Sequence, residues 1–174
     1  MAIVLILSKQ ITNRDASPEV LTSSNVAGAK SVVAVAVAAV GTVDSSTSTY
    51  RVVSVPSNAV INKISIWNDA STGAAQACTV DLYDTTANGG AIVKSAFFCP
   101  AVSFNVAAGT IADCTYTVSA AGTHNYSNAE KMLWQSNSSV TVDTNKWYDI
   151  VLNSTVNNTT PGCNIVVKVE YTLG

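Results

Sequence analysis

A two-residue alternation of apolar and polar positions runs through most of the chain. Successive side chains of a β-strand point to opposite faces of its sheet, so this period is typical of strands with one buried face. The segments 78–84, 146–154 and 163–173 each gather apolar residues on one face. We therefore predict a strand in each. In the last segment this face holds Cys163, Ile165, Val167, Val169, Tyr171 and Leu173.

The segment 32–40, VVAVAVAAV, alternates between two kinds of apolar residue. Val33, Val35 and Val37 share one face, and small alanines line the other. Alanine side chains are short and allow close approach. We therefore expect the alanine face to press against another sheet or another subunit, and we treat it as a candidate surface for subunit contact.

Turn signals separate the predicted strands. The triplet 88–90, Asn-Gly-Gly, is the strongest of them, because Asn and Gly accept the backbone conformations of tight turns. Pro56 stands between two β-branched runs, 49–55 and 59–67. Proline has no amide donor for a central strand and occurs at strand ends or bulges. We predict a corner at Pro56, where the chain leaves one sheet and enters the other.

These elements together predict an all-β fold. Valine outnumbers leucine by 25 to 7, and β-branched residues favour pleated strands. About eight strands with turns between them predict a single-domain, two-sheet β-sandwich of jelly-roll type over residues 31–174. Residues 1–30 contain a polar stretch without strand periodicity, and we expect them to form an extended N-terminal arm.

The low charge content of the chain indicates which partners its surface can have. Only 11% of residues are charged, against about 25% in a typical globular domain. Few charges keep copies apart, so we expect partners to cover part of the surface. The nine basic residues are scattered, which argues against a nucleic-acid partner. No run reaches the ~20 apolar residues of a membrane span. The start, MAIVLIL, lacks the basic residue that precedes the apolar core of an export signal. We therefore expect no membrane partner.

The sequence offers no recognisable catalytic, cofactor or metal site, and we expect the protein not to be an enzyme. Its one histidine, His124, lies in a loop-like stretch, where we expect it to be exposed, and no nucleophile motif accompanies it. Asp81 and Asp84 are expected on opposite faces of one strand, a poor arrangement for paired acid–base chemistry. The loop 84–90 lacks the closing glutamate of a calcium-binding loop.

Cysteine and tryptophan residues leave two further questions. The four cysteines contain no C-x-x-C pair, so zinc is not indicated, and buried free thiols are favoured over disulfides: Cys78, Cys99, Cys114 and Cys163. Trp67, Trp134 and Trp147 could form a sugar-binding platform. Their positions in or beside predicted strands favour burial in the core or at an interface instead.

Several long segments resemble a family of small structural proteins of tailed bacteriophages. They are SKQITNRDASPEVLTSSNVAGAK (8–30), VGTVDSSTSTYRVVSVPSNAVINKISIWNDA (40–70), CTVDLYDTTANGGAIVKSAFF (78–98), EKMLWQ (130–135) and KWYDIVLNST (146–155). The resemblance covers nearly the whole chain and departs from the family at the apolar start, MAIVLIL. It implies a head-decoration (cement) protein, made in the host cytoplasm and located in the virion, on the outer capsid surface, where it binds the major capsid protein and reinforces the shell.

We predict that partner contacts involve Gln10, Arg14 and Asp15 of the arm and the aromatic residues Trp67 and Trp147. The arm is expected to lie across the capsid or a neighbouring subunit, with Arg14 and Asp15 in inter-chain ion pairs; a frayed tail is the alternative. The first seven residues could instead add a strand to a sheet edge. For self-assembly we expect a homotrimer first and a homodimer second.

The principal alternative function is a receptor- or glycan-binding module of a phage tail or fibre. Such a module is expected to expose a cluster of aromatic side chains in loops, whereas a decoration protein is expected to bury them at subunit contacts.

Overall fold

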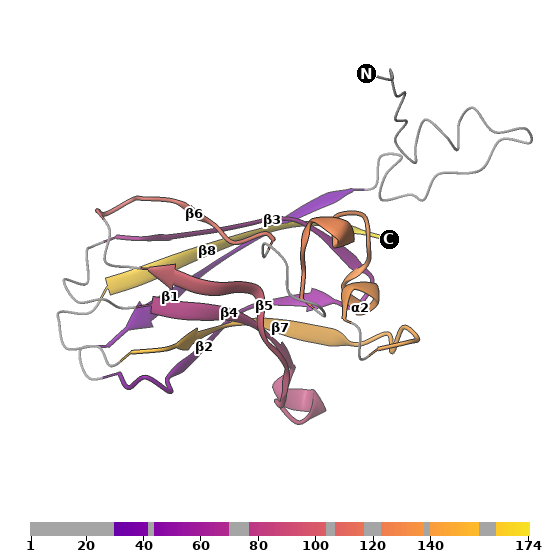
Figure 1. Ribbon diagram of the computed structural model, residues 1–174, viewed down its shortest axis with the longest axis horizontal. Coiled ribbons are helices and arrows are strands. Elements are labelled where there is room, and N and C mark those ends of the chain that lie inside the picture. Colours follow the sequence, from indigo (N-terminus) through magenta and orange to yellow (C-terminus); the bar gives the residue numbers. More distant parts are fainter. Residues whose placement is uncertain are drawn as a thin grey trace, which may run out of the picture.

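The computed structural model describes residues 30–41, 44–69, 77–103, 107–116, 123–137, 140–156 and 163–174. These form an all-β sandwich of two antiparallel four-stranded sheets (Figure 1). The first sheet has the order β1-β8-β3-β6 and the second β2-β7-β4-β5. The strands are β1 (Ser31–Val40), β2 (Thr49–Pro56), β3 (Ala59–Asn68), β4 (Ala77–Asp84), β5 (Ile92–Ser103), β6 (Ala112–Asp113), β7 (Trp147–Ser154) and β8 (Cys163–Leu173), and a short helix, α2 (Leu133–Ser136), lies between β6 and β7.

The strand order confirms the jelly-roll prediction. The strands form four antiparallel pairs: β1–β8, β2–β7, β3–β6 and β4–β5. In this order the pairs make up one long antiparallel hairpin. The tip of this hairpin is the turn between β4 and β5, and successive strand pairs lie alternately in the first and the second sheet. This winding is what places eight strands in two packed layers with Greek-key connections.

The hairpin tip contains the predicted Asn-Gly-Gly turn. Residues Thr86–Asn88 form one turn of 3₁₀ helix, and Gly89 and Gly90 follow with φ of 95° and 63°. A side chain at Gly90 would also meet the guanidinium of Arg51, since an added Cβ would lie 3.0 Å from Nη2. Glycine is required there both for the left-handed backbone and for this close approach.

Pro56 forms the corner that the sequence predicts. β2 ends at Pro56 in the second sheet, and β3 begins at Ala59 in the first. The corner is held by backbone hydrogen bonds, because the Ser57 amide donates to the Lys146 carbonyl over 2.8 Å. The Trp134 amide, in α2, donates in turn to the Ser57 carbonyl over 3.1 Å.

The predicted inward positions of the packed strands are buried, but in β7 the predicted outward residues Asp149 and Val151 are buried as well. The inward positions of β4, β7 and β8 are buried and fill the space between the sheets together with β3 and with Phe97 and Phe98 of β5. Leu173, predicted on the buried face of β8, is 43% exposed at the end of the strand. The core positions of the three alternating segments are Cys78, Val80, Leu82, Tyr148, Ile150, Leu152, Cys163, Ile165, Val167, Val169 and Tyr171.

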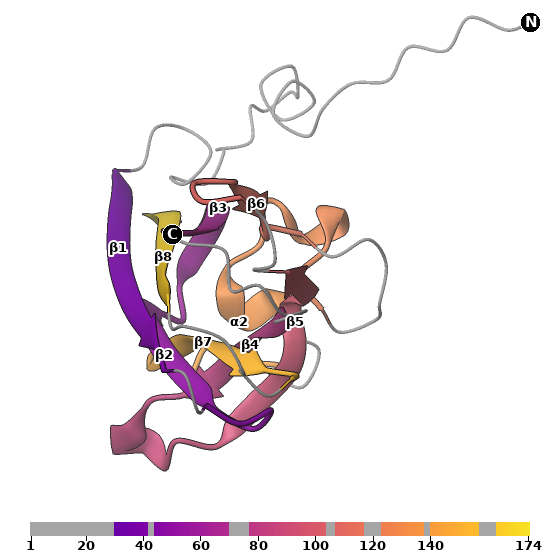
Figure 2. The same ribbon diagram turned by 90° about the vertical axis from the view of Figure 1, so that its left-hand side faces the viewer.

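β1 is the strand whose two faces are both apolar. Ala34 and Ala36 are half-buried and pack against the core, which confirms that the alanine face meets another part of the same domain. The valines of the other face point to solvent. Figure 2 shows β1 at the outer edge of the first sheet, with β8 beside it. The proposed arm, residues 1–30, lies outside the described residues except for Lys30.

Candidate interaction surface

The five residues predicted to contact partners are not brought together. Gln10, Arg14 and Asp15 lie outside the described residues. Trp67 is half-buried on β3, in the first sheet, whereas Trp147 begins β7 of the second sheet, opposite Pro56, with 52% of its surface exposed. The two tryptophans therefore belong to different surfaces of the sandwich.

The most exposed apolar strand surface among the described residues is the outer face of β1. Val33, Val35 and Val37, here called the valine stripe, are 54%, 60% and 63% exposed. The sequence did single out segment 32–40, but with the alanine face as the subunit contact. The structure corrects this choice, because the alanines line the interior and the valines line the surface.

The valine stripe continues across the first sheet at one end. The register places Val37 beside Val166 of β8, and Val166 beside Trp67 of β3. Paired residues of neighbouring strands point to the same face, so these three side chains form an apolar row on the outside of the sandwich. Trp67 thus lies on the outer face of the first sheet next to Val166, and its predicted partner contact remains a prediction.

The centre of the same face is charged. Lys168 and Glu170 of β8 form an ion pair of 2.7 Å, and the Lys168 hydrogen bond lowers the pKa of Glu170. Lys63 is registered next to Glu170. Val35 and Val33 lie beside Lys168 and Glu170, respectively. The outer face therefore combines an apolar row with a band of paired charges.

A groove borders this charged band. It has a volume of about 450 Å³ and is lined by Asn62, Lys63, Asp113, Thr115, Tyr116 and Tyr126. The ring centres of Tyr116 and Tyr126 are 5.2 Å apart, and Tyr126 is 70% exposed. The Thr115 hydroxyl and amide both donate to the Asp113 carboxylate, which lowers the pKa of Asp113.

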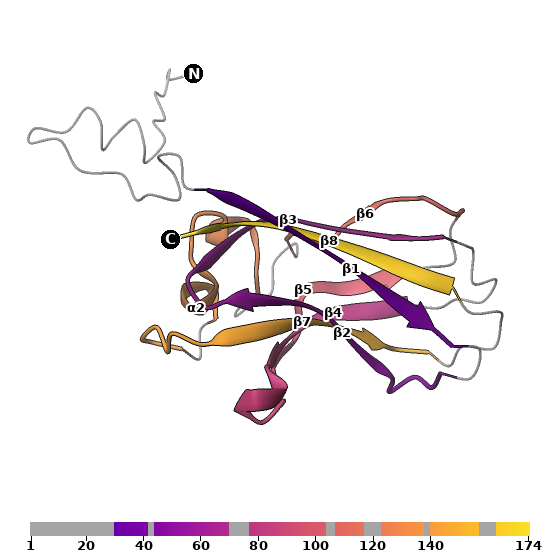
Figure 3. The same ribbon diagram turned by 180° about the vertical axis from the view of Figure 1, so that it is seen from behind.

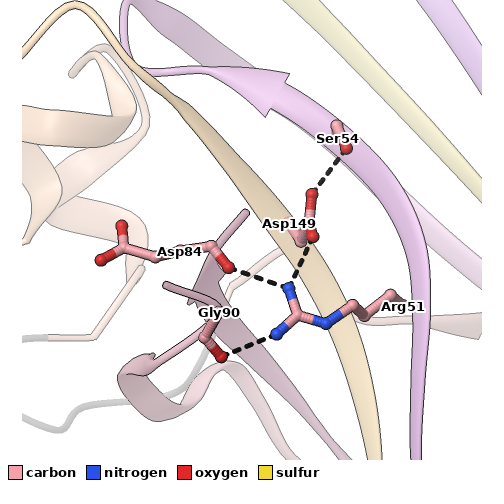
Figure 4. Close-up of polar contacts among 5 residues, drawn as sticks. All are labelled: Arg51, Ser54, Asp84, Gly90 and Asp149. Atoms are coloured by element: carbon pink, nitrogen blue, oxygen red, sulfur yellow. Dashed lines mark hydrogen bonds and ion pairs between the residues drawn. The ribbon is translucent and has the colours of Figure 1, made fainter. Parts of the chain in front are cut away.

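The second sheet carries a network of one ion pair and several hydrogen bonds around Arg51 (Figure 4). Arg51 of β2 donates through Nη1 to Asp149 Oδ2 over 2.7 Å. It also donates to the carbonyl oxygens of Asp84 (2.8 Å) and Gly90 (2.7 Å), at the hairpin tip. Ser54 donates to the second Asp149 oxygen over 2.6 Å. The guanidinium is occupied by the protein itself, so the network joins elements and is not a ready site for an anionic ligand.

The prediction that His124 is exposed is wrong, because the side chain is fully buried. Its ring stacks on Tyr116 at 5.0 Å and lies 5.5 Å from the Phe98 ring. Burial lowers the pKa of His124 to about 4, so the imidazole is neutral near pH 7. The loop-like sequence around it gave no sign of this aromatic environment.

The described residues also include the four cysteines and the other side chains that could bind a metal ion. Their His, Cys, Asp and Glu side chains form no group of three that could hold a metal ion. The four cysteines are free thiols; Cys99 is half-buried and the other three are buried. Burial raises the pKa of Cys78 to about 12, which keeps this thiol protonated. No helix in the described ranges is long and apolar enough to cross a membrane.

Comparisons with known proteins give a partial likeness of fold. No protein-family model matches the chain, and no curated protein matches it. Among solved structures, a chain of the cyanophage Pam1 capsid asymmetric unit is 17% identical, with a TM-score of 0.47 over 84% of this chain and 87% of that one. A chain of the acid-stable capsid of Helicobacter pylori bacteriophage KHP30 is 13% identical, with a TM-score of 0.41 over 83% of this chain and 92% of that one. Values this low carry no functional argument.

Proposed function

We propose that the protein is a head-decoration (cement) protein of a tailed bacteriophage. In this role it binds the outer surface of the major capsid protein lattice and stabilises the head. The observation that carries the proposal is the exposed valine stripe of the first sheet, which the half-buried Val166 and Trp67 extend across the sheet. Contiguous exposed apolar surface on a small domain is typical of protein-interaction sites. The same role is the one implied by the resemblance of the motifs in 8–30, 40–70 and 78–98 to phage structural proteins.

The physical properties of the chain suit attachment to a repeating surface. Its few charged groups include several that pair within the domain, as Arg51 does with Asp149 and Lys168 with Glu170. The uncharged part of the outer face of the first sheet can contact an apolar partner at a small free-energy cost, because no charged group there has to leave water. On a lattice, a modest affinity per contact is sufficient, because neighbouring sites raise the effective concentration.

The proposal places the protein in the virion after synthesis in the host cytoplasm. Its partners are the major capsid protein and other copies of itself. The arm residues Gln10, Arg14 and Asp15 remain predicted contacts of the same role.

Binding to isolated heads tests the function directly. Purified protein is added to phage heads that lack it, and the bound amount is measured by sedimentation and quantitative gel analysis. Wild-type protein is expected to saturate the heads and to raise the temperature at which they release DNA. Val166→Lys places a charge in the apolar row and should weaken binding at least about tenfold, an effect of ~1.4 kcal/mol.

Val142→Lys is the matched control, because Val142 is a 70% exposed valine outside this row. It should bind like the wild type. If wild-type protein does not bind heads, or if the two variants bind equally well, the proposed role is wrong.

The groove beside Tyr116 and Tyr126 favours a second candidate, a glycan-binding module of a tail or fibre. The exposed Tyr126 ring can stack on a sugar ring, and the Asn62 amide and Asp113 carboxylate oxygens beside it can accept hydrogen bonds from sugar hydroxyl groups. The same assay separates the two functions when host cells are included. Binding to cells and not to heads, lost in Tyr126→Ala, would support the glycan-binding candidate.

A further inference from the structure

Each sheet of the sandwich has two edges, and three of the four carry features that prevent pairing with another strand. β6 has only two residues. β2 contains Arg51 and Pro56 and has a register shift between Arg51 and Val53. β5 contains Lys94 and Pro100, has three register shifts against β4, and bends at Ala96 with φ of 51°. Short strands, charges, prolines and bulges are the usual means by which proteins protect sheet edges.

β1 has none of these features. Its ten residues contain no charge, proline or glycine. It pairs with β8 from Ser31–Thr172 to Val40–Cys163 without a register shift, so the strand is regular along its whole length. Within the described part of the chain, no strand pairs with its other edge. Figure 3 shows β1 running the length of the sandwich in front of β8. An edge of this kind exposes a row of backbone donors and acceptors that can pair with another strand.

The sequence of β1 is nearly symmetric about Val35. Ala34 and Ala36 flank it, followed by Val33 and Val37, and the exposed positions at the ends are Ser31 and Ala39. Two copies that run antiparallel with Val35 opposite Val35 therefore place Val33 of each opposite Val37 of the other. A two-fold contact requires a surface that is complementary to itself, and a strand with a symmetric sequence meets this requirement.

We propose that β1 pairs with β1 of a second copy of this chain, antiparallel and with the two-fold axis at Val35. The two first sheets then join into one continuous sheet. The two valine stripes meet on its outer face and form one apolar surface across both copies. This contact favours the dimer over the trimer that the sequence led us to expect. It uses the edge of β1 and does not depend on the proposed binding of capsids by the face.

Self-association of the purified full-length chain tests the proposal. Sedimentation velocity over a range of concentrations should show a monomer–dimer equilibrium. Val35→Lys places two like charges opposite each other on the axis and should raise the dissociation constant at least about tenfold. Val142→Lys adds the same charge at an exposed valine elsewhere and should change nothing. Thermal melts of both variants report whether each remains folded.

Cysteine cross-linking tests the register. Oxidised glutathione is the oxidant: two thiols lose two electrons and two protons to form the disulfide, and the glutathione disulfide is reduced to two thiols. Val35→Cys should cross-link to itself. Val33→Cys and Val37→Cys should cross-link to each other when mixed, and far less alone, because the axis places residue 33 opposite residue 37. Wild-type protein, with its four native cysteines, gives the background.

Other occupants of the β1 edge give different results. If the first residues of a neighbouring copy fill the edge, deletion of residues 1–18 should abolish the dimer, and Val35→Cys should not cross-link. The proposal would be overturned by this loss of the dimer on deletion. It would also be overturned by a monomer at all concentrations, or by a dimer or trimer that Val35→Lys does not weaken. Val166→Lys lies on β8, away from the edge, and should leave the dimer intact even if capsid binding is lost, which separates this inference from the proposed function.

Discussion

His124 and Asp149 illustrate how strongly packing determines the behaviour of single polar side chains. Neither sequence neighbourhood indicates burial, yet the first is enclosed by Phe97, Phe98 and Tyr116, and the second accepts hydrogen bonds from Arg51 and Ser54. The imidazole gains no charge near pH 7, because burial penalises its protonated form. Its role in the folded protein is that of a packed aromatic ring.

Burial of His124 predicts a loss of stability in mild acid. The pKa is lowered from an ordinary 6.5 to about 4 in the folded protein, so the unfolded chain binds a proton first as the pH falls. Stability is therefore complete above pH 6.5 and decreases towards pH 4. Between pH 7.5 and 4.5 the free energy of unfolding should fall by ~2–3 kcal/mol from this group.

Urea denaturation at both pH values checks this prediction in the wild type and in His124→Phe, which keeps a ring but cannot titrate. The quantity compared is the change with pH in each protein, so a general effect of the substitution cancels. An equal decrease in both proteins would show that other groups cause it.

Among the elements, β2 is joined to the hairpin tip by the Arg51 side chain. Arg51 joins β2 to Asp149 of β7 and to the carbonyl groups of Asp84 and Gly90, which flank the β4–β5 turn. Its side chain is 32% exposed and that of Asp149 only 10%. Removing the guanidinium leaves a mostly buried carboxylate with Ser54 as its remaining donor among the hydrogen bonds described here.

Arg51→Met should therefore destabilise the fold by about 1–2 kcal/mol, a value reduced for the partial exposure of the pair. Lys168→Met removes a more exposed pair with Glu170 and should cost clearly less than Arg51→Met, because water screens the exposed charges. Chemical denaturation of the two variants measures both effects. Equal losses would contradict the view that the Arg51 network holds β2 in place.

For the whole molecule, the sandwich and the N-terminal arm have separate expected roles. The described hydrophobic core consists of residues between Val40 and Tyr171, and the sequence predicts an arm that lies outside this sandwich. The arm carries Gln10, Arg14 and Asp15, which we expect to contact the capsid or a neighbouring subunit.

Because the sequence predicts an extended arm separate from the 31–174 sandwich, we expect deletion of residues 1–18 to leave the melting temperature within about 2 °C of the wild type. Occupancy on capsids should fall in the same variant, as measured by sedimentation with heads. Unchanged occupancy would mean that the arm is a frayed tail, and a large loss of thermal stability would mean that it packs against the sandwich.

The alternation along the chain was enough to predict the all-β class, the number of strands and the buried positions of β4, β7 and β8. The corner at Pro56 and the turn at Gly89 and Gly90 were also predictable, because a missing amide donor and a left-handed backbone are properties of the residue itself. These features depend on residues that are close together in the sequence, so the sequence alone is enough to predict them.

The packed structure was needed for the orientation of β1, the burial of His124 and the partners of Arg51. Both faces of β1 are apolar, so hydrophobicity could not choose between them, and the choice came from pairing with β8 more than 120 residues away in the chain. Arg51 likewise meets Asp149 across 98 positions of sequence. Such contacts follow from how strands are wound into two sheets, and a two-residue period fixes only which side chains share a face.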